Sequence, residues 1–572
     1  MAEITGGELL LKCLHAERVR HLIAIPDGTY NIVLEALQRR RDEFDCDLIV
    51  PRHEAAAAHM ADAYTRVTGE PAVVMACAGP GAANLVSGVI TAQAEGSPVV
   101  AITTTRRSDI AYPHTGAMQV AEQLAYFKPI VKWNAQVRDW RRIPDLVRQA
   151  FRVATSGRPG PVHLDIPENL LNQKGEEASA PVWERDAYRA GRGSVPEPAL
   201  IRQAAELLVE AELLNLHCGS GALRSGAQDE LQALAEHLGT PVTTGVGGRG
   251  IIPEDHELSI HPLCPASAMV HQGADLVLAV GTRFGELDFW GRQPMWGEPS
   301  AQRVIQIDAD PNYVGLNRPA ELVLIGDAKQ TLAELLEAVK GLTAQRKLHA
   351  RMAEFRAVQQ DWKQKLEADI ADEQRSPLLT GILFKILDEF FPRDAIMAMD
   401  GGNTCMWAVH YHFVHAPRTL LWTSNFGHLG TGVPYALGAK LAFPERPVYA
   451  VVGDGAFGFN MQELETAVRH NLPVVIVVAV DGAWGMEKTS QNRIFGRAGD
   501  YFGCEHAPVR YDQVAQAMGC HGEYVTTGAE FRAALSCAAA SGKPAVIHAV
   551  VDAEANVDPP GTAIWAASHA AT

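Results

Sequence analysis

The sequence predicts an α/β protein built from three doubly wound parallel-sheet domains. Short runs rich in β-branched residues alternate with longer segments rich in Ala and Leu, which is the pattern of parallel strands joined by crossover helices. The chain has 572 residues, too many for one hydrophobic core and suited to two to four domains. Its 47% hydrophobic and 20% charged residues are typical of a globular protein.

The first predicted α/β domain covers residues 1–172. Its expected strands, each followed by a helical pattern, are 22–26, 47–51, 72–76, 98–104 and 161–167. Residues 173–198 are polar and contain Pro and Gly, so we predict a linker there.

Two further domains follow the linker. The central domain is predicted over residues 199–340 and, after a charged linker helix at 341–376, the third domain over residues 377–551. The tail, residues 552–572, is turn-rich and could either be disordered or fold over an active site as a lid. The expected strands of these two domains are 214–219, 241–245, 275–281, 303–308, 395–400, 447–453, 473–480 and 545–551.

Charge and cysteine content exclude several classes of function. The formal net charge of −17 argues against a nucleic-acid or anionic-membrane partner, since both require a basic surface. Nine scattered cysteines without a CxxC pair indicate neither a zinc site nor a disulfide framework. The longest apolar run, Pro473 to Val480, is too short to span a bilayer. We therefore expect a soluble, cytoplasmic protein.

An acidic residue follows each of two expected strands in the third domain. Asp454 ends the strand at 447–453, and Asp481 ends the strand at 473–480. The carboxyl ends of parallel strands are where α/β sheets place ligands. Oxygen ligands of this kind suit Mg²⁺, which also retains waters and binds phosphates. An isolated Gly-Asp-Gly would more often be a simple turn, but the return of Asp481 to the same sheet edge favours a metal site.

Two other features complete a metal–diphosphate site with a proton-transfer group. Gly455 and Ala456 leave backbone N–H groups available to a phosphate at the start of a helix. Far upstream, Glu54 begins a helical pattern in Arg52-His53-Glu54 and supplies an ionisable carboxylate. The alternative interpretation of Glu54 is an exposed helix N-terminal glutamate, which the helix dipole also favours.

With these motifs, the chain resembles thiamine-diphosphate-dependent enzymes of the acetolactate synthase and benzaldehyde lyase branch over essentially its full length. The resemblance implies that Asp454, Asp481 and the backbone carbonyl of Ala483 bind Mg²⁺. The family usually has two asparagines where this chain has Val480 and Asp481. Asp also offers an oxygen ligand, but it adds one negative charge to the site.

The resemblance also implies how the cofactor is held. Glu54 matches the glutamate that hydrogen-bonds the pyrimidine ring, Leu429 the large side chain between the two rings, and Gly427 the carbonyl that accepts the pyrimidine amine. Further matches are expected to contact the cofactor: Pro26, Asn84, Gly402, Asn403, Thr404, Gly455, Ala456 and Met486.

Four residues besides Glu54 are candidates for catalysis on the substrate. Gln119 matches an active-site glutamine of synthases and lyases, and Thr29 lies in a turn where some lyases have histidine. His428, next to the predicted Leu429 wedge, is a possible acid or base. Glu487 stands where synthases have an apolar residue, and we hypothesise that it handles a proton on the substrate. The alternative is that Glu487 turns outward to Lys488 or Arg493.

Two departures bear on cofactor and substrate. The tryptophan that helps synthases select a second 2-oxo acid is missing from Met486-Glu487-Lys488-Thr489-Ser490. In the central domain, residues 279–293 lack the acidic pair that follows Arg-Phe in synthases, and Gly219-Ser220-Gly221 is only a weak nucleotide motif. We therefore expect no FAD, while binding of ADP or coenzyme A stays open.

These features predict a thiamine-diphosphate- and Mg²⁺-dependent carboligase. It would decarboxylate a 2-oxo acid such as pyruvate and join the carbanion to an acceptor. The alternatives are a lyase of 2-hydroxy ketones or 2-hydroxyacyl-CoA and a simple 2-oxo acid decarboxylase. A flavin- or nicotinamide-dependent oxidoreductase would need a dinucleotide fingerprint, which the sequence lacks. The resemblance implies a homodimer at minimum, and we expect a homotetramer.

Overall fold

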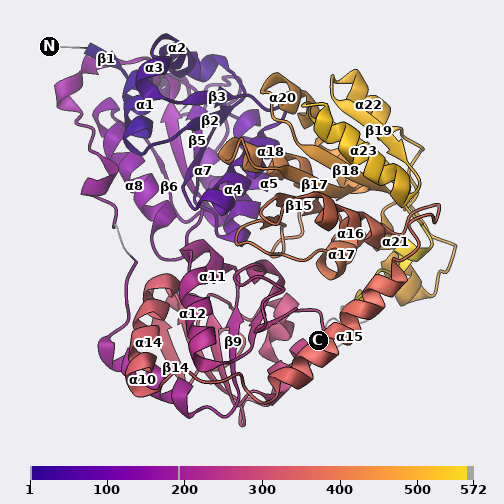
Figure 1. Ribbon diagram of the computed structural model, residues 1–572. Coiled ribbons are helices and arrows are strands. Elements are labelled where there is room, and N and C mark those ends of the chain that lie inside the picture. The colour runs from indigo at the N-terminus through magenta and orange to yellow at the C-terminus, as the bar shows by residue number, and fades with distance from the viewer. Residues whose placement is uncertain (1–2, 112, 191–192, 563–572) are drawn as a thin grey trace. The chain divides into compact units, whose positions relative to one another are not determined.

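A computed structural model describes residues 3–111, 113–190 and 193–562 and contains three six-stranded parallel sheets flanked by helices (Figure 1). This confirms the predicted fold class. The described chain forms two compact units, and each is treated by itself below. The first unit comprises residues 1–191, 423–445 and 459–474, and the second comprises residues 192–422, 446–458 and 475–572.

The sheet of the first unit has the strand order β3-β2-β4-β5-β7-β6 and is parallel throughout. Its strands are β2 His21–Ala24, β3 Asp47–Ile49, β4 Ala72–Ala76, β5 Val99–Thr105, β6 Asn134–Gln136 and β7 Val162–Pro167. Its helices are α1 Gly6–Ala16, α2 Asn31–Arg39, α3 Arg41–Phe44, α4 Glu54–Thr68, α5 Pro80–Glu95, α6 Ser108–Ala111, α7 Gln123–Phe127, α8 Ile143–Thr155, α9 Glu168–Asn172, α18 Gly432–Ala442 and α20 Glu463–Arg469.

Small residues let α4 pack very closely between α5 and α18. A Cβ added at Gly88 of α5 would lie 2.4 Å from the Cβ of Ala58, and one at Gly438 of α18 would lie 2.2 Å from the carbonyl oxygen of Met60. Interiors packed this tightly tolerate little displacement. The alanine-rich sequence after Glu54 therefore fixes the position of the helix that begins with this residue.

The predicted linker at 173–198 begins with a strand. β8, Lys174–Glu176, pairs antiparallel with β1, Glu3–Thr5, in a two-stranded sheet. Three residues are too few for a period-2 hydrophobic pattern, so neither strand could be predicted from the sequence.

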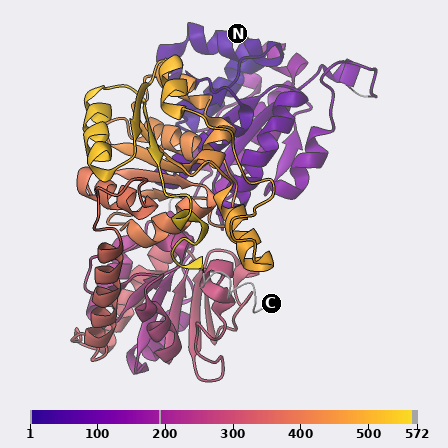
Figure 2. The same ribbon diagram turned by 90° about the vertical axis from the view of Figure 1, so that its right-hand side faces the viewer.

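The central sheet, in the second unit, has the order β11-β10-β9-β12-β13-β14 and is also parallel. Figure 2 shows this domain in magenta, with helices on either side of the sheet. Its strands are β9 Leu214–Cys218, β10 Val242–Thr244, β11 Ser259–Ile260, β12 Leu276–Val280, β13 Arg303–Asp308 and β14 Leu322–Ile325. Its helices are α10 Pro198–Glu210, α11 Ser220–Ser225, α12 Gln228–Leu238, α13 Pro265–Gly273 and α14 Ala328–Leu342, and α15 Met352–Asp369 follows it.

The third sheet has the order β16-β15-β17-β18-β20-β19 and is parallel. Its strands are β15 Ile396–Asp400, β16 Leu420–Leu421, β17 Val448–Gly453, β18 Val475–Val480, β19 His521–Val525 and β20 Ala545–Val550. The helices are α16 Thr380–Phe390, α17 Gly402–Tyr411, α19 Asp454–Asn460, α21 Gly485–Phe495, α22 Tyr511–Ala517 and α23 Gly528–Ala540.

A buried ion pair joins the central and third domains within the second unit. Arg249 donates to both carboxylate oxygens of Glu254, at 2.6 and 2.7 Å, and to the backbone carbonyls of Val409 and His412. Glu254 in turn accepts the backbone N–H of Val414. Buried charges are tolerated when they are paired and hydrogen-bonded in this way.

Across the described residues, every helix is too short or too polar to cross a membrane.

Candidate active site

The predicted cofactor residues lie in both units, and each group is described separately. Asp454, Asp481 and the diphosphate candidates belong to the second unit, whereas Glu54 and the loop with Gly427 and Leu429 belong to the first.

The two predicted metal ligands follow neighbouring strands. β17 and β18 are parallel partners with Gly453 opposite Ala479, so Asp454 and Asp481 leave the sheet at the same edge. The two loops are joined by a hydrogen bond from the backbone N–H of Gly482 to Oδ2 of Asp454, at 2.9 Å. Each carboxylate also caps its own loop, because Asp454 accepts the N–H of Gly455 and Asp481 accepts the N–H of Ala483.

The electrostatics of this pair fit a divalent cation. Asp454 is 3% exposed, and burial, followed by the charge of Asp481, raises the pKa of its carboxyl group. Burial likewise raises the pKa of Asp481. Two acids held this close repel each other once both are ionised, and a cation bound by both removes that penalty. The donor chemistry therefore fits Mg²⁺.

The remaining positions around such a cation would have to come from other oxygens. In residues 3–111, 113–190 and 193–562, no group of three or more His, Cys, Asp or Glu side chains is placed to hold a metal. Two carboxylates with a backbone carbonyl, here that of Ala483, leave positions for waters and phosphates, which is the coordination Mg²⁺ usually has in proteins.

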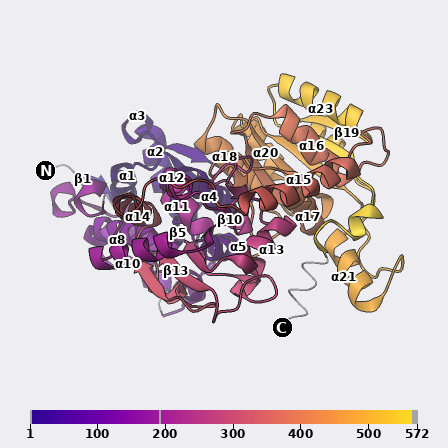
Figure 3. The same ribbon diagram turned by 60° about the horizontal axis from the view of Figure 1, so that its bottom comes forward.

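Glycines form the predicted diphosphate loop between β15 and α17. Gly401 has φ 101°, and a Cβ added to it would lie 3.3 Å from the backbone N of Gly453. A Cβ at Gly402 would lie 2.5 Å from the Cβ of Met486, so the start of α17 packs closely against α21 (both helices are labelled in Figure 3). The first-turn N–H groups of α17 have no partner within the helix, so they can bind an anion.

The Asn403 side chain has other partners in this structure. Its Nδ2 donates to the backbone carbonyl of Asn556 and to Oγ1 of Thr489, at 2.6 and 2.9 Å, and its Oδ1 is buried without a partner among the described residues. Thr404 is buried. A phosphate contact here would therefore use backbone N–H groups, and the side-chain role predicted for Asn403 stays a prediction.

Three residues next to the metal loops carry no sequence motif. A Cβ at Gly455 would lie 2.8 Å from the ring of Trp484 and 3.2 Å from that of His506. Nδ1 of His506 lies 3.7 Å from Oδ2 of Asp454. Asn556 donates to Oδ2 of Asp481. Sequence reasoning missed all three: Trp484 follows Asp481 by three residues but matches no motif, and only tertiary contacts place His506 and Asn556 beside the two acids.

The Glu487 side chain is exposed on α21. The two partners considered for it form other ion pairs, Lys488 with Glu505 at 2.7 Å and Arg493 with Asp558 at 2.9 Å. The outward orientation of the alternative fits the exposed side chain, and its pairing with Lys488 or Arg493 stays a prediction. An exposed carboxylate costs no desolvation energy, so Glu487 needs no partner in the single chain, and its catalytic role stays a prediction.

Glu54 is the first residue of α4 and is 9% exposed. Asn84 donates to its Oε2 at 3.0 Å. Gly81 leaves room at the other oxygen, because a Cβ there would lie 3.0 Å from Oε1 of Glu54 and 2.6 Å from Sγ of Cys77. One carboxylate oxygen is thus oriented by the protein while a further donor can approach the other, as a proton-exchanging glutamate requires.

The loop with the predicted wedge is anchored by a buried acid. Glu95 is 1% exposed and accepts the backbone N–H and the side-chain N–H of Asn425, at 2.8 and 2.9 Å. Beyond this anchor, Gly427 is exposed with φ 67° and Leu429 is half-buried. Their assigned contacts with the cofactor stay predictions.

Two histidine rings meet beside this loop. The ring centroids of His428 and His59 are 4.7 Å apart. Burial lowers the pKa of His428, and it lowers that of His59 to about 3. His428 is therefore neutral near pH 7 and could accept a proton more readily than donate one.

The remaining catalytic candidates, Thr29 and Gln119, differ in burial and in the contacts of their side chains. Thr29 is buried, and its hydroxyl is hydrogen-bonded to Asp27 and to Thr104, so it stabilises the turn that follows the exposed Pro26. Its hydroxyl is thereby engaged, and its predicted catalytic role has no contact in support of it. Gln119 is half-buried with φ 66°.

A second glutamine, Gln123, was not predicted and organises the loops at this sheet edge. It is buried, its Oε1 accepts the backbone N–H of Gly79, and its Nε2 donates to Thr103 and Asp165. A Cβ at Gly79 would lie 2.7 Å from the carbonyl oxygen of Gln119. Gln123 and Gly79 therefore hold the backbone at Gln119 in place.

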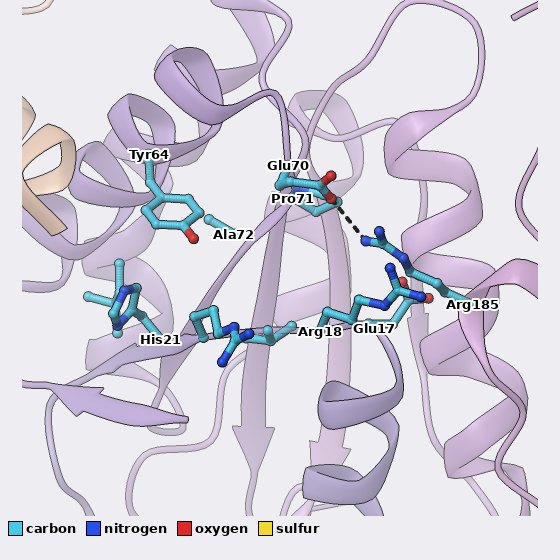
Figure 4. A pocket seen from close by; sticks show the side chains of 11 residues that line it. Glu17, Arg18, His21, Tyr64, Glu70, Pro71, Ala72 and Arg185 are labelled. Carbon is cyan, nitrogen blue, oxygen red and sulfur yellow. Dashed lines mark hydrogen bonds and ion pairs between the residues drawn. The ribbon is translucent and has the colours of Figure 1, made fainter. Parts of the chain in front are cut away.

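A cavity of about 250 Å³ in the first unit lies away from these residues (Figure 4). It is lined by His21 and Ala72, which begin β2 and β4, whereas the candidate site lies after the carboxyl ends of these strands. Its charged groups have partners, since Arg185 pairs with Glu70 at 3.1 Å and Glu17 accepts from Arg189. This cavity is therefore not part of the candidate site.

Comparison with known proteins matches three consecutive domains of one family. Residues 4–125 match the N-terminal TPP binding domain of thiamine pyrophosphate enzymes, residues 201–335 their central domain, and residues 400–549 their C-terminal TPP binding domain. The chain is 33% identical to the probable acetolactate synthase large subunit of Methanocaldococcus jannaschii, over 97% of this chain and 94% of that protein.

This chain belongs to the thiamine pyrophosphate enzyme family. It is also 32% identical to the acetolactate synthase large subunit of Corynebacterium glutamicum, over 97% of this chain and 88% of that protein. For the acetolactate synthase isozyme 3 large subunit of Escherichia coli, identity is 31% over 86% of this chain and 85% of that protein. The predicted acetolactate synthase-like branch is thereby confirmed, and so is thiamine diphosphate as the cofactor.

The family matches cover the predicted site residues unevenly. Glu54 and Asn84 fall within the N-terminal match, and Asp454 and Asp481 fall within the C-terminal match. Asn556 lies beyond residue 549 and so outside all three. Residues 563–572, the end of the predicted lid, lie outside the described residues.

Proposed function

We propose that this thiamine pyrophosphate enzyme is a Mg²⁺-dependent carboligase of the acetolactate synthase type. It would release CO₂ from a 2-oxo acid such as pyruvate and join the remaining fragment to an acceptor. The observation that best supports the proposal is the pairing of buried Asp454 with Asp481, in a chain whose relatives are named acetolactate synthase large subunits.

The residues of the third domain would hold the cofactor. Asp454, Asp481 and the carbonyl of Ala483 would bind Mg²⁺, and N–H groups at the starts of α17 and α19 would bind the diphosphate. When bound, thiamine diphosphate supplies the electron sink that accepts the electron pair of the breaking C–C bond. The protein contributes orientation, exclusion of water and proton transfer.

Glu54 would exchange the proton that activates the cofactor. Its burial limits the access of bulk water to the carboxylate, and Asn84 orients the carboxylate through Oε2. Oε1, next to Gly81, is then the oxygen that would hold or release the proton. On the substrate side, neutral His428, Gln119 and exposed Glu487 are the candidates.

The proposed enzyme is a homodimer at minimum. By resemblance to the family, we propose a homotetramer in the cytoplasm. Large apolar side chains on and after α21 support association, because Ile494, Phe495 and Phe502 are 70%, 66% and 83% exposed. Apolar side chains of this size gathered on one segment are typical of an interaction surface.

A lyase of 2-hydroxy ketones or 2-hydroxyacyl-CoA is the second candidate function. It is favoured by residues 486–490, where the synthase tryptophan is missing and Glu487 adds a carboxylate at the start of α21. A simple 2-oxo acid decarboxylase, which releases the fragment without an acceptor, is a third candidate.

We propose that the enzyme binds no FAD, and a purified protein without flavin absorbance would agree with this.

The experiment that tests the proposal measures CO₂ release from a panel of 2-oxo acids, with and without added thiamine diphosphate and Mg²⁺. We expect CO₂ release that requires both additions. We also expect a product that contains the remaining fragment joined to an acceptor. Release without a ligated product would indicate a simple decarboxylase. Absence of release in a preparation that binds the cofactor would refute the carboligase, and cleavage of a 2-hydroxyacyl-CoA would then support the lyase. A Glu54→Gln variant is the matched control.

A further inference from the structure

The C-terminal segment reaches the metal loops through one buried side chain. Asn556 lies in the short 3₁₀ helix Ala555–Val557 and is 6% exposed. Its Nδ2 donates to Oδ2 of Asp481, while its Oδ1 accepts Nε1–H of Trp407 at 2.8 Å. Its backbone carbonyl accepts Nδ2 of Asn403 at 2.6 Å. This one residue therefore contacts a metal-ligand candidate and a diphosphate-loop candidate at once.

The side chains at this junction lie close to the backbone of Gly485. A Cβ at Gly485 would lie 2.6 Å from Oδ2 of Asp481, 3.1 Å from Nδ2 of Asn403 and 3.3 Å from Nδ2 of Asn556. Thr489 of α21 donates to the backbone carbonyl of Val557 at 2.7 Å, which holds the segment from the other side. The polar atoms of three separate chain segments thus converge on a glycine.

These contacts determine the orientation of the Asp481 carboxylate. Oδ1 accepts the N–H of Ala483 at 3.1 Å and Oδ2 accepts Nδ2 of Asn556, so both oxygens are oriented by donors. Without Asn556, Oδ2 would lose this donor, while the contact of Oδ1 within the loop would remain. Outer hydrogen bonds of this kind typically change metal affinity by about 10- to 100-fold.

We propose that Asn556 is a positioning residue that holds Asp481 in its metal-binding orientation and thereby couples docking of the segment 552–562 to Mg²⁺ binding. This inference rests on the proposed Mg²⁺ site. Coupling between two binding events is reciprocal. If the docked segment raises Mg²⁺ affinity by a given factor, bound Mg²⁺ must lower the population of the undocked segment by the same factor.

The test uses the full-length protein with thiamine diphosphate at saturation. Mg²⁺ affinity is measured by calorimetry, and amide hydrogen exchange of residues 552–562 is measured with and without Mg²⁺. In the wild type, Mg²⁺ is expected to slow exchange of the segment. In Asn556→Ala, Mg²⁺ affinity is expected to fall roughly 10-fold or more, and Mg²⁺ should no longer slow exchange of the segment.

Two further variants separate positioning from general packing. Asp558→Asn removes one exposed ion pair, that with Arg493, from the same segment and leaves Asn556 intact. Such pairs contribute little, so its Mg²⁺ affinity should stay within about twofold of wild type. Asn556→Leu keeps a side chain of similar size but cannot donate to Asp481, and it should lower Mg²⁺ affinity even if Asn556→Ala does not fold.

The outcomes distinguish this inference from the proposed function. If the wild type shows no Mg²⁺-dependent binding of thiamine diphosphate, the proposed Mg²⁺ site is refuted and the inference with it. If the wild type binds both, but Asn556→Ala and Asn556→Leu bind Mg²⁺ as tightly, only the inference is overturned. It is also overturned if exchange of the segment is unaffected by Mg²⁺ in the wild type.

Discussion

Replacing Asp481 with Asn is expected to stabilise the metal-free protein and to weaken its binding of Mg²⁺. In the wild type, burial and the charge of Asp481 raise the pKa of Asp454, which shows that the pair is unfavourable when both groups are ionised. Asn keeps an oxygen ligand and can still accept from Asn556, but it removes one of the two charges.

The magnitude follows from Coulomb's law. Two unit charges about 4 Å apart interact by about 1 kcal/mol in water and about 4 kcal/mol at an effective dielectric constant of 20. Asp454 is buried, so the increase in the free energy of unfolding that Asp481→Asn produces at alkaline pH should lie between these limits. A loss of about 1.4 kcal/mol of attraction would weaken Mg²⁺ binding about tenfold.

The pH dependence has a definite sign. The folded-state pKa of Asp454 is raised above the unfolded value of about 3.9, so the metal-free folded protein binds more protons between the two values. Stability should be full below about pH 4, fall as pH rises through the raised pKa, and stay low above it. The Asp481→Asn variant should show a smaller fall, since Asp454 then has no charged neighbour in this pair.

The assay is thermal unfolding of the metal-free protein at pH 5 and pH 8, with a Mg²⁺ titration in the presence of thiamine diphosphate. Several domains need not unfold in one step, so the transition of the third domain must be followed, for example by hydrogen exchange in β17 and β18. Asp558→Asn is the control, because it removes one exposed carboxylate outside the Asp454–Asp481 pair and shows the effect of losing a negative charge in general. An Asp481→Asn protein that is no more stable than wild type at pH 8, or that binds Mg²⁺ as tightly, would refute the reasoning.

Three further changes test other parts of the structure. Glu54→Gln should lower turnover by about 10²- to 10⁴-fold with little change in the Kd of the cofactor, measured by steady-state kinetics and calorimetry, and near-normal turnover would rule out the proton role. Gly81→Ala should cost about 1–3 kcal/mol of stability because its Cβ meets Cys77 and Glu54, and an unchanged melting temperature would contradict the observed packing. Arg249→Met should cost about 3–5 kcal/mol by leaving Glu254 buried and unpaired, and adding Glu254→Gln should restore part of the loss in urea unfolding.

The strands that sequence patterns did not predict are mostly at sheet edges. β6, β11, β14, β16 and β19 each occupy an edge of one of the six-stranded sheets. An edge strand has one neighbour and is often short and polar, so it lacks the apolar run that marks a strand buried on both faces. The central strands, such as β17 and β18, have that run and were predicted.

The sequence by itself determined the three-sheet fold and the proximity of Asp454 and Asp481. Both follow from local periodicity, because consecutive β-α-β units place the carboxyl ends of parallel strands at one sheet edge. Only the tertiary structure decided which side chains support the site. Asn556 contacts Asp481 across 75 positions and Asn403 across 153, and Gln123 contacts Gly79 across 44. Contacts of this kind depend on the packing of distant segments, so no period or spacing in the chain encodes them.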